Sequence, residues 1–452
     1  IVFHPGRQKE STAMSRTHIL LVYPEIPDTY WSMKQAIQVI GKKALLPPLG
    51  LLTIAACFPE NRYELRLVDM NIGKLGKADL AWAELVMISA MLVQKDSFHA
   101  VVDRCQALGL LVVAGGPYPS ASVSGIPGVN VLVKGEAELA MPGLLADLEA
   151  GYPAAVYEES AKPEMDDTPI PRFALARLSA YSSMPIQFSR GCPFACEFCD
   201  ITSMFGHRVR TKSPERFIRE LEALLAVGAG EDVFVVDDNF IGNRPQARKL
   251  LEALARWQAE HGTPFNLSTE ASIDLARDED LLDLMVAANF TMVFIGLETP
   301  HAASLASTGK QQNLRLDPEA AVAAIQKKGI QVSGGFIVGF DTDPPDICLR
   351  QASFVRSLAV PVAMVGLLTA LPGTELSRRL KSEGRLLSES SGNNTHNASF
   401  NFRTVLPTEA LIAGYHQLMG EIYKPRVYFD RCLAFLSRLK EGGRSRIKRH
   451  RI

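Results

Sequence analysis

Short apolar runs alternate with helix-length segments along the first third of the chain. Five of these runs are each followed by a turn or a helical stretch: residues 18–22, 63–68, 85–88, 111–114 and 129–133. Strands that are separated by helices argue for a parallel α/β sheet of the doubly wound, Rossmann-like kind. We therefore expect one domain over residues 14–151, with its ligand outside the carboxyl ends of the strands.

The same alternation restarts near residue 186. Apolar runs predict six strands, at residues 186–189, 233–236, 265–269, 292–295, 332–338 and 362–370. Helices are expected at residues 214–227, 245–260, 279–288, 318–328 and 347–358, several of them opened by proline or an acidic residue. Six β/α units are fewer than the eight of a closed barrel, so residues 182–375 predict a partial (β/α)6 barrel. Its substrate mouth is expected at the carboxyl ends of the strands.

Other segments depart from this alternation. Residues 152–181 are rich in proline and charge, which predicts a linker that buries no core. Residues 376–452 predict a small helical C-terminal domain, with helices at 408–422 and 426–439 that are interrupted by Pro425. The basic run at residues 444–451 is typical of a solvated tail and is also compatible with contact to an anionic membrane surface. The polar residues before Met14 are interpreted as an extension or as an upstream reading of the start codon.

Composition excludes several classes of protein. A chain of 452 residues with 47% hydrophobic and 21% charged residues is that of a globular protein of two or three domains. The net charge of -1 gives no reason to expect a nucleic-acid partner. The longest apolar stretch, residues 44–58, is too short for a membrane span and contains two prolines. Seven cysteines without a disulfide-type arrangement fit a cytoplasmic, reducing location.

Three of these cysteines lie close together. Cys192, Cys196 and Cys199 form the pattern C-x-x-x-C-x-x-C after an expected strand, and the glycine and proline beside them favour a loop over a helix. Thiolates are the usual protein ligands of iron–sulfur clusters, and three of them would leave one iron of a four-iron cluster open to another ligand. A structural Cys3His zinc site that uses His207 is the alternative.

Acidic and amide side chains follow the expected strands of the second domain. They are Asp237, Asp238, Asn239, Glu270 and Glu298. Buried carboxylates need partners, so these residues suit a polar small molecule with hydroxyls and an ammonium group better than a packed core. Three alternating basic residues after the cysteine loop fit either a ligand carboxylate or a solvated edge: Arg208, Arg210 and Lys212.

Small and polar residues follow the expected strands of the first domain. They are Asn71, Ser89, Gly115, Gly116, Pro117 and Glu136. Two successive glycines let a bulky cofactor approach the backbone, although an ordinary tight turn explains them equally well. The sequence contains neither G-x-G-x-x-G nor G-x-x-x-x-G-K-[ST], which disfavours a nicotinamide or nucleoside-triphosphate site.

With both domains in view, the chain resembles the cobalamin-dependent (class B) radical S-adenosylmethionine (SAM) enzymes. In that family a cobalamin-binding sheet domain precedes a partial barrel. The resemblance extends over residues 18–375 and rests on the cysteine motif, with Phe198 before its last cysteine. It also rests on residues 47–50, 115–117, 135–136, 237–240, 296–299 and 371–374. The C-terminal helices are similar to the extra domain of a subgroup that includes hopanoid C-2 methylases.

The resemblance implies a [4Fe–4S] cluster, SAM and cobalamin as cofactors. It assigns the three cysteines to the cluster, places Phe198 beside the adenine of SAM, and assigns the acidic and amide strand ends to SAM. It assigns the small and polar strand ends of the first domain to cobalamin. Two departures stand out: Asn71 and Lys74 replace the histidine and the last glycine of D-x-H-x-x-G, which implies cobalt without a lower histidine ligand. No Gly-Gly-Glu run follows the second barrel strand, and Asp237 and Asp238 stand in that region for the ammonium group of SAM.

The implied activity is radical methylation of an unactivated carbon, in a small-molecule or lipid substrate such as a hopanoid. Oxidative cyclisation or rearrangement without methyl transfer, RNA methylthiotransfer and non-enzymatic cobalamin binding are the alternatives. The resemblance further implies an electron donor such as flavodoxin or ferredoxin, no nucleic-acid partner, and peripheral membrane contact. Radical chemistry needs a dry site, and the C-terminal helices are expected to cover it.

Overall fold

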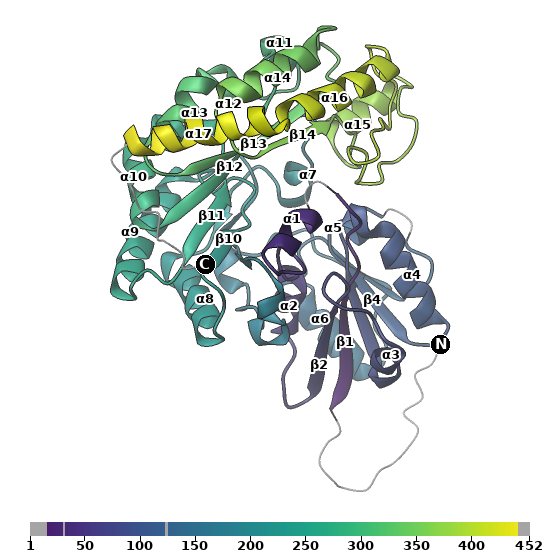
Figure 1. Cartoon of the computed structure of the whole chain (residues 1–452). Coiled ribbons are helices and arrows are strands. Elements are labelled where there is room, and N and C mark those ends of the chain that lie inside the picture. The colour runs from purple at the N-terminus through teal and green to yellow at the C-terminus, as the bar shows by residue number, and fades with distance from the viewer. Residues whose placement is uncertain (1–15, 30–31, 123–124, 442–452) are drawn as a thin grey trace, which may run out of the picture. The chain divides into compact units, whose positions relative to one another are not determined.

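The computed structural model describes residues 16–29, 32–122 and 125–441 (Figure 1). These residues form two compact units. Unit 1 comprises residues up to 186 together with 219–230, and unit 2 comprises residues 187–218 together with 231 onward. Within the described ranges, none of the helices has the length and apolar character that crossing a membrane requires.

Unit 1 is built on a parallel sheet with the strand order β2-β1-β3-β4-β5-β6. The strands are β1 (Thr17–Tyr23), β2 (Tyr63–Asp69), β3 (Leu85–Ser89), β4 (Leu111–Gly115), β5 (Val131–Lys134) and β6 (Val156–Glu158). The order reverses direction between β1 and β3, which is where open sheets of this kind bind ligands. The doubly wound sheet that the sequence predicts is confirmed.

Helices cover both faces of this sheet because β1 is apolar on both sides. Ile19 and Leu21 belong to one buried cluster, whereas Leu20 and Val22 belong to the other. Successive side chains of a strand point to opposite faces, so a continuous apolar run fits a strand that is buried on both. The helices are α1 (Lys34–Val39), α2 (Leu49–Ala55), α3 (Lys77–Trp82), α4 (Lys95–Gln106), α5 (Pro117–Ser120) and α6 (Met141–Ala150).

The segment 152–181 buries more than its composition predicts. It contains β6, which pairs with β5, and the buried side chains of Met165, Phe173 and Tyr181. The expectation that this segment buries no core is therefore wrong, because scattered large apolar residues anchor a chain that is otherwise polar. Short 3-10 helices lie here and elsewhere: η1 (Leu92–Gln94), η2 (Met165–Asp167), η3 (Phe173–Leu175), η4 (Leu178–Ala180) and η5 (Ile273–Arg277).

Unit 2 contains parallel strands in the order β14-β13-β12-β11-β10. They are β10 (Asp232–Val235), β11 (Asn266–Glu270), β12 (Phe290–Glu298), β13 (Gln331–Val338) and β14 (Ala363–Leu367), and β7 (Met184–Ile186) precedes the unit in the chain. Helices join successive strands: α9 (Arg244–Glu260), α10 (Glu279–Ala287), α11 (Ala302–Ser307), α12 (Gln311–Leu314), α13 (Pro318–Lys327) and α14 (Ile347–Ser357). The boundary between the units passes through α8 (Pro214–Ala226). The partial barrel is confirmed.

The C-terminal helices belong to unit 2. They are α15 (Glu375–Ser382), α16 (Thr408–Ile422) and α17 (Pro425–Glu441), with Pro425 at the start of a helix as the sequence predicts. Helix α16 packs against α14, and α17 packs against α13 (Figure 1). Arg431 of α17 is buried and donates to the backbone oxygens of Val360 and Ile422. The basic run at residues 444–451 lies outside the described residues.

A different segment lies at the strand ends. The backbone N–H of Leu367 donates to Thr395 Oγ1 at 3.1 Å, and Asn401 bonds to both the N–H and the oxygen of Ala370. The expectation that α16 and α17 cover the mouth of the barrel is therefore wrong. Residues 383–403 lie there instead, because α16 and α17 bury their apolar faces on the helical layer.

Candidate functional site

The cysteine loop of unit 2 is held by backbone contacts at both ends. It follows β8 (Ser189–Arg190), which pairs with β9 (Arg210–Thr211), and precedes α7 (Ile201–Phe205). Gly191 has a φ of 97°, and a Cβ at this position would lie 2.7 Å from the oxygen of Arg208. Only glycine tolerates both conditions, so the start of the motif is fixed by backbone geometry.

The second half of the loop rests on residues 308–309. The N–H of Glu197 donates to the oxygen of Thr308 at 2.9 Å. Gly309 has a φ of 73°, and a Cβ there would lie 2.7 Å from the oxygen of Ala195. Two segments that are distant in sequence therefore define the path of the cysteines.

The thiols suit an iron–sulfur cluster. Cys192, Cys196 and Cys199 are half-buried, and within the described part of the chain they form no disulfide. Burial raises the pKa of Cys192 and raises that of Cys199 to about 12. Buried thiols with raised pKa values become thiolates when a cationic metal centre compensates the charge, so the donor set fits the cluster.

A single-ion site is not formed by these residues. In the described residues, no three His, Cys, Asp or Glu side chains gather as the ligands of one metal ion would. His207, the fourth ligand of the zinc alternative, instead lines a pocket of about 540 Å³ together with Arg208 and Arg244. The other two basic residues that follow the cysteine loop, Arg210 and Lys212, are both buried.

The three polar residues after β10 have different partners. Asp237 is buried and accepts from the N–H of Phe188 at 2.8 Å and from Ser189 Oγ at 2.6 Å. Asn239 Oδ1 accepts from the N–H and the hydroxyl of Ser272. Both side chains therefore brace the backbone around the site.

Asp238 has the opposite character. Its buried Oδ2 has no hydrogen-bond partner in the described residues, and burial, followed by the charge of Asp237, raises its pKa to about 7. Burial, followed by Asp238 and Asp237, raises the pKa of Glu270 to about 8. Raised carboxyl pKa values mean that the charged forms lack a compensating cation. An ammonium group fits this pair.

Glu298 is already paired. Its Oε1 accepts from Lys310 Nζ at 2.7 Å, and a Cβ on Gly296 would lie 2.4 Å from the same oxygen. Burial lowers the pKa of Lys310, but Glu298 and then Cys196 more than offset this, so the pKa is raised overall. Lys310 Nζ also lies 5.9 Å from the ring centroid of Phe198. The pair therefore places a cation beside the cluster loop.

Sequence reasoning missed three polar residues near this loop. Besides Lys310, they are Gln312, whose Nε2 lies 3.8 Å from Cys196 Sγ, and Asn313, whose Nδ2 donates to the oxygens of Gly296 and Leu297. Gln312 Oε1 and Asn313 Oδ1 are buried acceptors without a partner among the described residues. Gln312 and Asn313 lie within α12 and Lys310 directly precedes it, so the strand-end pattern could not reveal them.

The predicted cobalamin residues lie at strand ends of unit 1. Ser89 ends β3, Gly115 ends β4, and Glu136 follows β5 and pairs with Lys162 at 3.6 Å. Gly116 has a φ of 90°, and a Cβ there would lie 2.6 Å from Ser89 Oγ; Pro117 begins α5 directly afterwards. The ends of β3 and β4 therefore approach each other closely, which explains the glycine at position 116, and the assignment of these residues to cobalamin stays a prediction.

Asn71 has a structural role in this unit. Its Oδ1 accepts from the N–H of Ile26 at 2.8 Å, and its Nδ2 donates to Asp69 Oδ1 at 2.7 Å and to the oxygen of Pro24 at 3.3 Å. The other oxygen of Asp69 accepts from the buried Tyr181 hydroxyl at 2.8 Å. Asn71 therefore ties the ends of β1 and β2 together, where the axial-histidine proteins carry a metal ligand.

Three family models match successive parts of the chain. Residues 39–145 match the B12 binding domain, residues 186–347 match the radical SAM superfamily, and residues 374–451 match a domain of unknown function (DUF4070). The first match contains β2 to β5 of unit 1, and the second contains the cysteine loop and most of the sheet of unit 2.

Similar proteins are named methyltransferases. The chain is 43% identical to the uncharacterized methyltransferase sll1242 of Synechocystis sp., over 91% of this chain and 77% of that protein. It is 34% identical to the hopanoid C-2 methylase of Rhodopseudomonas palustris, over 94% of this chain and 80% of that protein. The structure of the radical SAM methyltransferase TsrM from Kitasatospora setae, with cobalamin and [4Fe–4S] cluster bound, matches with a TM-score of 0.63 at 16% identity. That match covers 83% of this chain and 80% of TsrM and concerns the fold.

Proposed function

The chain belongs to the family of cobalamin-dependent radical SAM methyltransferases that includes hopanoid C-2 methylase, and we propose that it methylates an unactivated carbon of a hopanoid-type polycyclic lipid. The substrate class is inferred from the hopanoid C-2 methylase, which matches along 94% of this chain, including the C-terminal helices. When bound, the cluster supplies the electron that cleaves SAM, and cobalamin carries the methyl group.

The observation that carries the chemistry is the unequal pairing of the acidic residues. Cys192, Cys196 and Cys199 would hold the cluster, and three ligands would leave one iron for SAM. Asp238 and Glu270 are the carboxylates that gain most from an ammonium group, because burial has raised both pKa values. Asp237 and Asn239 keep their supporting contacts, and Glu298 keeps its pair with Lys310.

The test uses a host that makes hopanoids and lacks its own C-methylase. The chain is expressed there with methionine that carries a labelled methyl group, and the extracted lipids are examined by mass spectrometry. A labelled, singly methylated hopanoid is expected. An unlabelled product of altered ring structure would favour cyclisation. Unchanged lipids from cells that contain cluster- and cobalamin-loaded protein would contradict the proposed lipid substrate.

We further propose peripheral contact with a membrane, where such a substrate resides. Three apolar side chains at helical spacing on α17 are exposed: Phe429 (61%), Leu433 (61%) and Leu436 (39%). A stripe of this kind inserts into a membrane interface more favourably than it remains in water. Anionic lipid vesicles should sediment the wild-type protein, and Phe429→Ser with Leu433→Ser should weaken this binding. Equal sedimentation of both proteins would contradict the contact.

A small redox protein of the flavodoxin or ferredoxin class is proposed as the electron donor. Reduction of the cluster by each purified donor, followed by electron paramagnetic resonance, tests this directly. Reduction by a chemical reductant but by neither protein would contradict it.

A further inference from the structure

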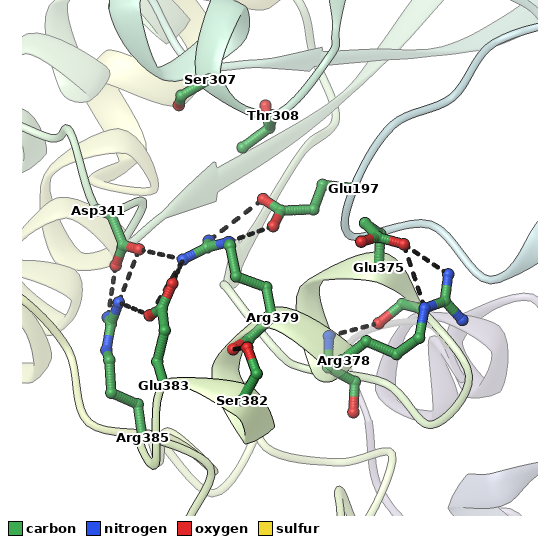
Figure 2. Close-up of polar contacts among 12 residues, drawn as sticks. Glu197, Ser307, Thr308, Asp341, Glu375, Arg378, Arg379, Ser382, Glu383 and Arg385 are labelled. Carbon is green, nitrogen blue, oxygen red and sulfur yellow. Dashed lines mark hydrogen bonds and ion pairs between the residues drawn. The ribbon is translucent and has the colours of Figure 1, made fainter.

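Glu197 lies between the second and third cysteines of the motif, and its side chain points toward Arg379 of α15 (Figure 2). Its backbone is fixed on both sides: its N–H donates to the oxygen of Thr308, and its oxygen accepts from the N–H of Leu376, each at 2.9 Å. Leu376 belongs to α15, so the C-terminal region contacts the loop directly.

Arg379 of α15 holds the Glu197 carboxylate with two hydrogen bonds. Its Nε donates to Oε1, and its Nη2 donates to Oε2 at 3.2 Å. Nη1 of the same guanidinium donates to Asp341 Oδ2 at 2.9 Å, and Asp341 follows β13. A guanidinium that binds one carboxylate through two nitrogens fixes both position and orientation. One side chain thus connects the cysteine loop, α15 and a strand end.

Arg379 is itself held in place. Glu383 Oε1 accepts from its Nη1 at 3.1 Å, and Arg385 bonds to both oxygens of Asp341 and to Glu383 Oε2. Figure 2 shows these five charged residues as one connected network. Each carboxylate of the network has an arginine partner. Several contacts therefore share the cost of ordering these flexible side chains.

Burial distinguishes this network from an ordinary surface ion pair. The Glu197 side chain is 12% exposed and that of Arg379 is 33% exposed. By contrast, the neighbouring Arg378 pairs with Glu375 within the same helix, and these side chains are 61% and 65% exposed. Exposed ion pairs contribute little to stability, whereas partly buried bidentate pairs restrict the motion of the two side chains they join.

The next residue of the loop is also held by the C-terminal region. Phe198 packs against a buried apolar cluster that contains Phe340, Leu376, Leu380 and Phe402. The side chains of Glu197 and Phe198 therefore both contact residues that lie in, or next to, the segment 374–403.

We propose that Arg379 is a positioning residue for the iron–sulfur cluster, acting through Glu197 to set the geometry of the loop between Cys196 and Cys199. On this account, the C-terminal region beyond residue 374 is part of the cluster-binding apparatus. The proposal does not depend on which carbon is methylated.

The experiment compares Arg379→Met with Arg378→Met in full-length, anaerobically reconstituted protein. The first variant should lose iron to a chelator several-fold faster than wild type and should show an altered electron paramagnetic resonance spectrum of the reduced cluster, with and without SAM. The second variant keeps the wild-type rate and spectrum. Cobalamin content and far-ultraviolet circular dichroism serve as folding controls and should be unchanged in both.

Glu197→Gln tests the same contact from the loop side, and it decides the matter if Arg379→Met fails to fold. It should reproduce the changed spectrum. Arg379→Lys should retain more of the cluster than Arg379→Met, because lysine keeps the positive charge but cannot bind the carboxylate through two nitrogens. Adding Arg379→Met to Glu197→Gln should change little more, since the coupled pair is already broken. Wild-type chelator kinetics and spectra in Glu197→Gln, or equal losses in Arg378→Met, would overturn the proposal.

Discussion

The carboxyl ends of the two sheets satisfy their polar groups differently. In unit 1, Asn71, Asp69 and Tyr181 bond to one another and to backbone groups. In unit 2, Asp238 keeps an unpartnered buried oxygen among the described residues, and Glu270 has a strongly raised pKa. The first edge therefore suits a ligand that is held by shape, whereas the second suits a ligand that brings positive charge.

The largest expected effect is that of Cys199→Ala, which should abolish cofactor binding in unit 2 and leave it unchanged in unit 1. Cys199→Ala removes a cluster ligand, so iron content and SAM cleavage to 5′-deoxyadenosine should fall to background. Cobalamin content should remain at the wild-type level because the B12-type sheet lies in unit 1. Metal analysis and corrinoid absorption measure both, with Cys432→Ala as the control. Parallel loss of cobalamin would break the comparison.

Lys310→Met should destabilise unit 2 strongly. It leaves the buried Glu298 carboxylate without its partner, and breaking a buried pair in this way costs about 3–5 kcal/mol. Denaturant unfolding of the apoprotein measures the loss. Lys310→Met combined with Glu298→Gln should recover much of it, and a double variant as unstable as the single one would contradict the pairing argument.

Asp238→Asn should weaken SAM binding and leave cluster content unchanged. Loss of a charged hydrogen bond of about 1.5–3 kcal/mol corresponds to a fall in affinity of about 10- to 150-fold. Equilibrium dialysis with labelled SAM measures it, and Asp280→Asn, on an exposed helix start, is the matched control. Wild-type affinity in Asp238→Asn would show that the unpartnered oxygen does not face SAM.

Asn71→Ala in unit 1 should lower stability and leave ligand affinity nearly unchanged, the reverse of Asp238→Asn in unit 2. The free energy of unfolding should fall by about 1–3 kcal/mol, because the Asp69 carboxylate and the N–H of Ile26 lose partners. Cobalamin affinity, measured by absorption titration, should change only a few-fold. A large loss of affinity at unchanged stability would instead assign Asn71 to the ligand.

A pH dependence of apoprotein stability tests the raised pKa of Glu270 in unit 2. The pKa of Glu270 is about 8 in the folded chain against 4.5 ordinarily, so the folded state binds a proton that the unfolded state releases over this range. Stability from this group is therefore full below about pH 4 and falls as the pH rises toward 8. Glu270→Gln should melt a few degrees above wild type at pH 9 and equally at pH 4. Identical melting curves at both values would contradict the raised pKa.

Local patterns in the sequence were enough to predict both sheets and the cluster motif. Strand periodicity and the cysteine spacing depend on residues that are neighbours in the chain, and the matching strands are confirmed. Two expectations were wrong for the same reason, namely that residues 152–181 bury no core and that α16 and α17 cover the mouth of the barrel. The surface on which a segment packs depends on partners that are distant in sequence.

The sequence by itself determined that three thiols follow a strand and that carboxylates follow several others. Only the tertiary structure decided which of those carboxylates keeps a buried oxygen without a hydrogen-bond partner among the described residues. Asp237, Asp238 and Asn239 are adjacent and chemically similar, yet contacts from Ser189 and Ser272 satisfy the first and the last. Lys310 and Arg379 reach the cluster loop from other segments, and no spacing rule covers such contacts. Hydrogen bonding and burial act through space, and they therefore decide which polar residues remain free for chemistry.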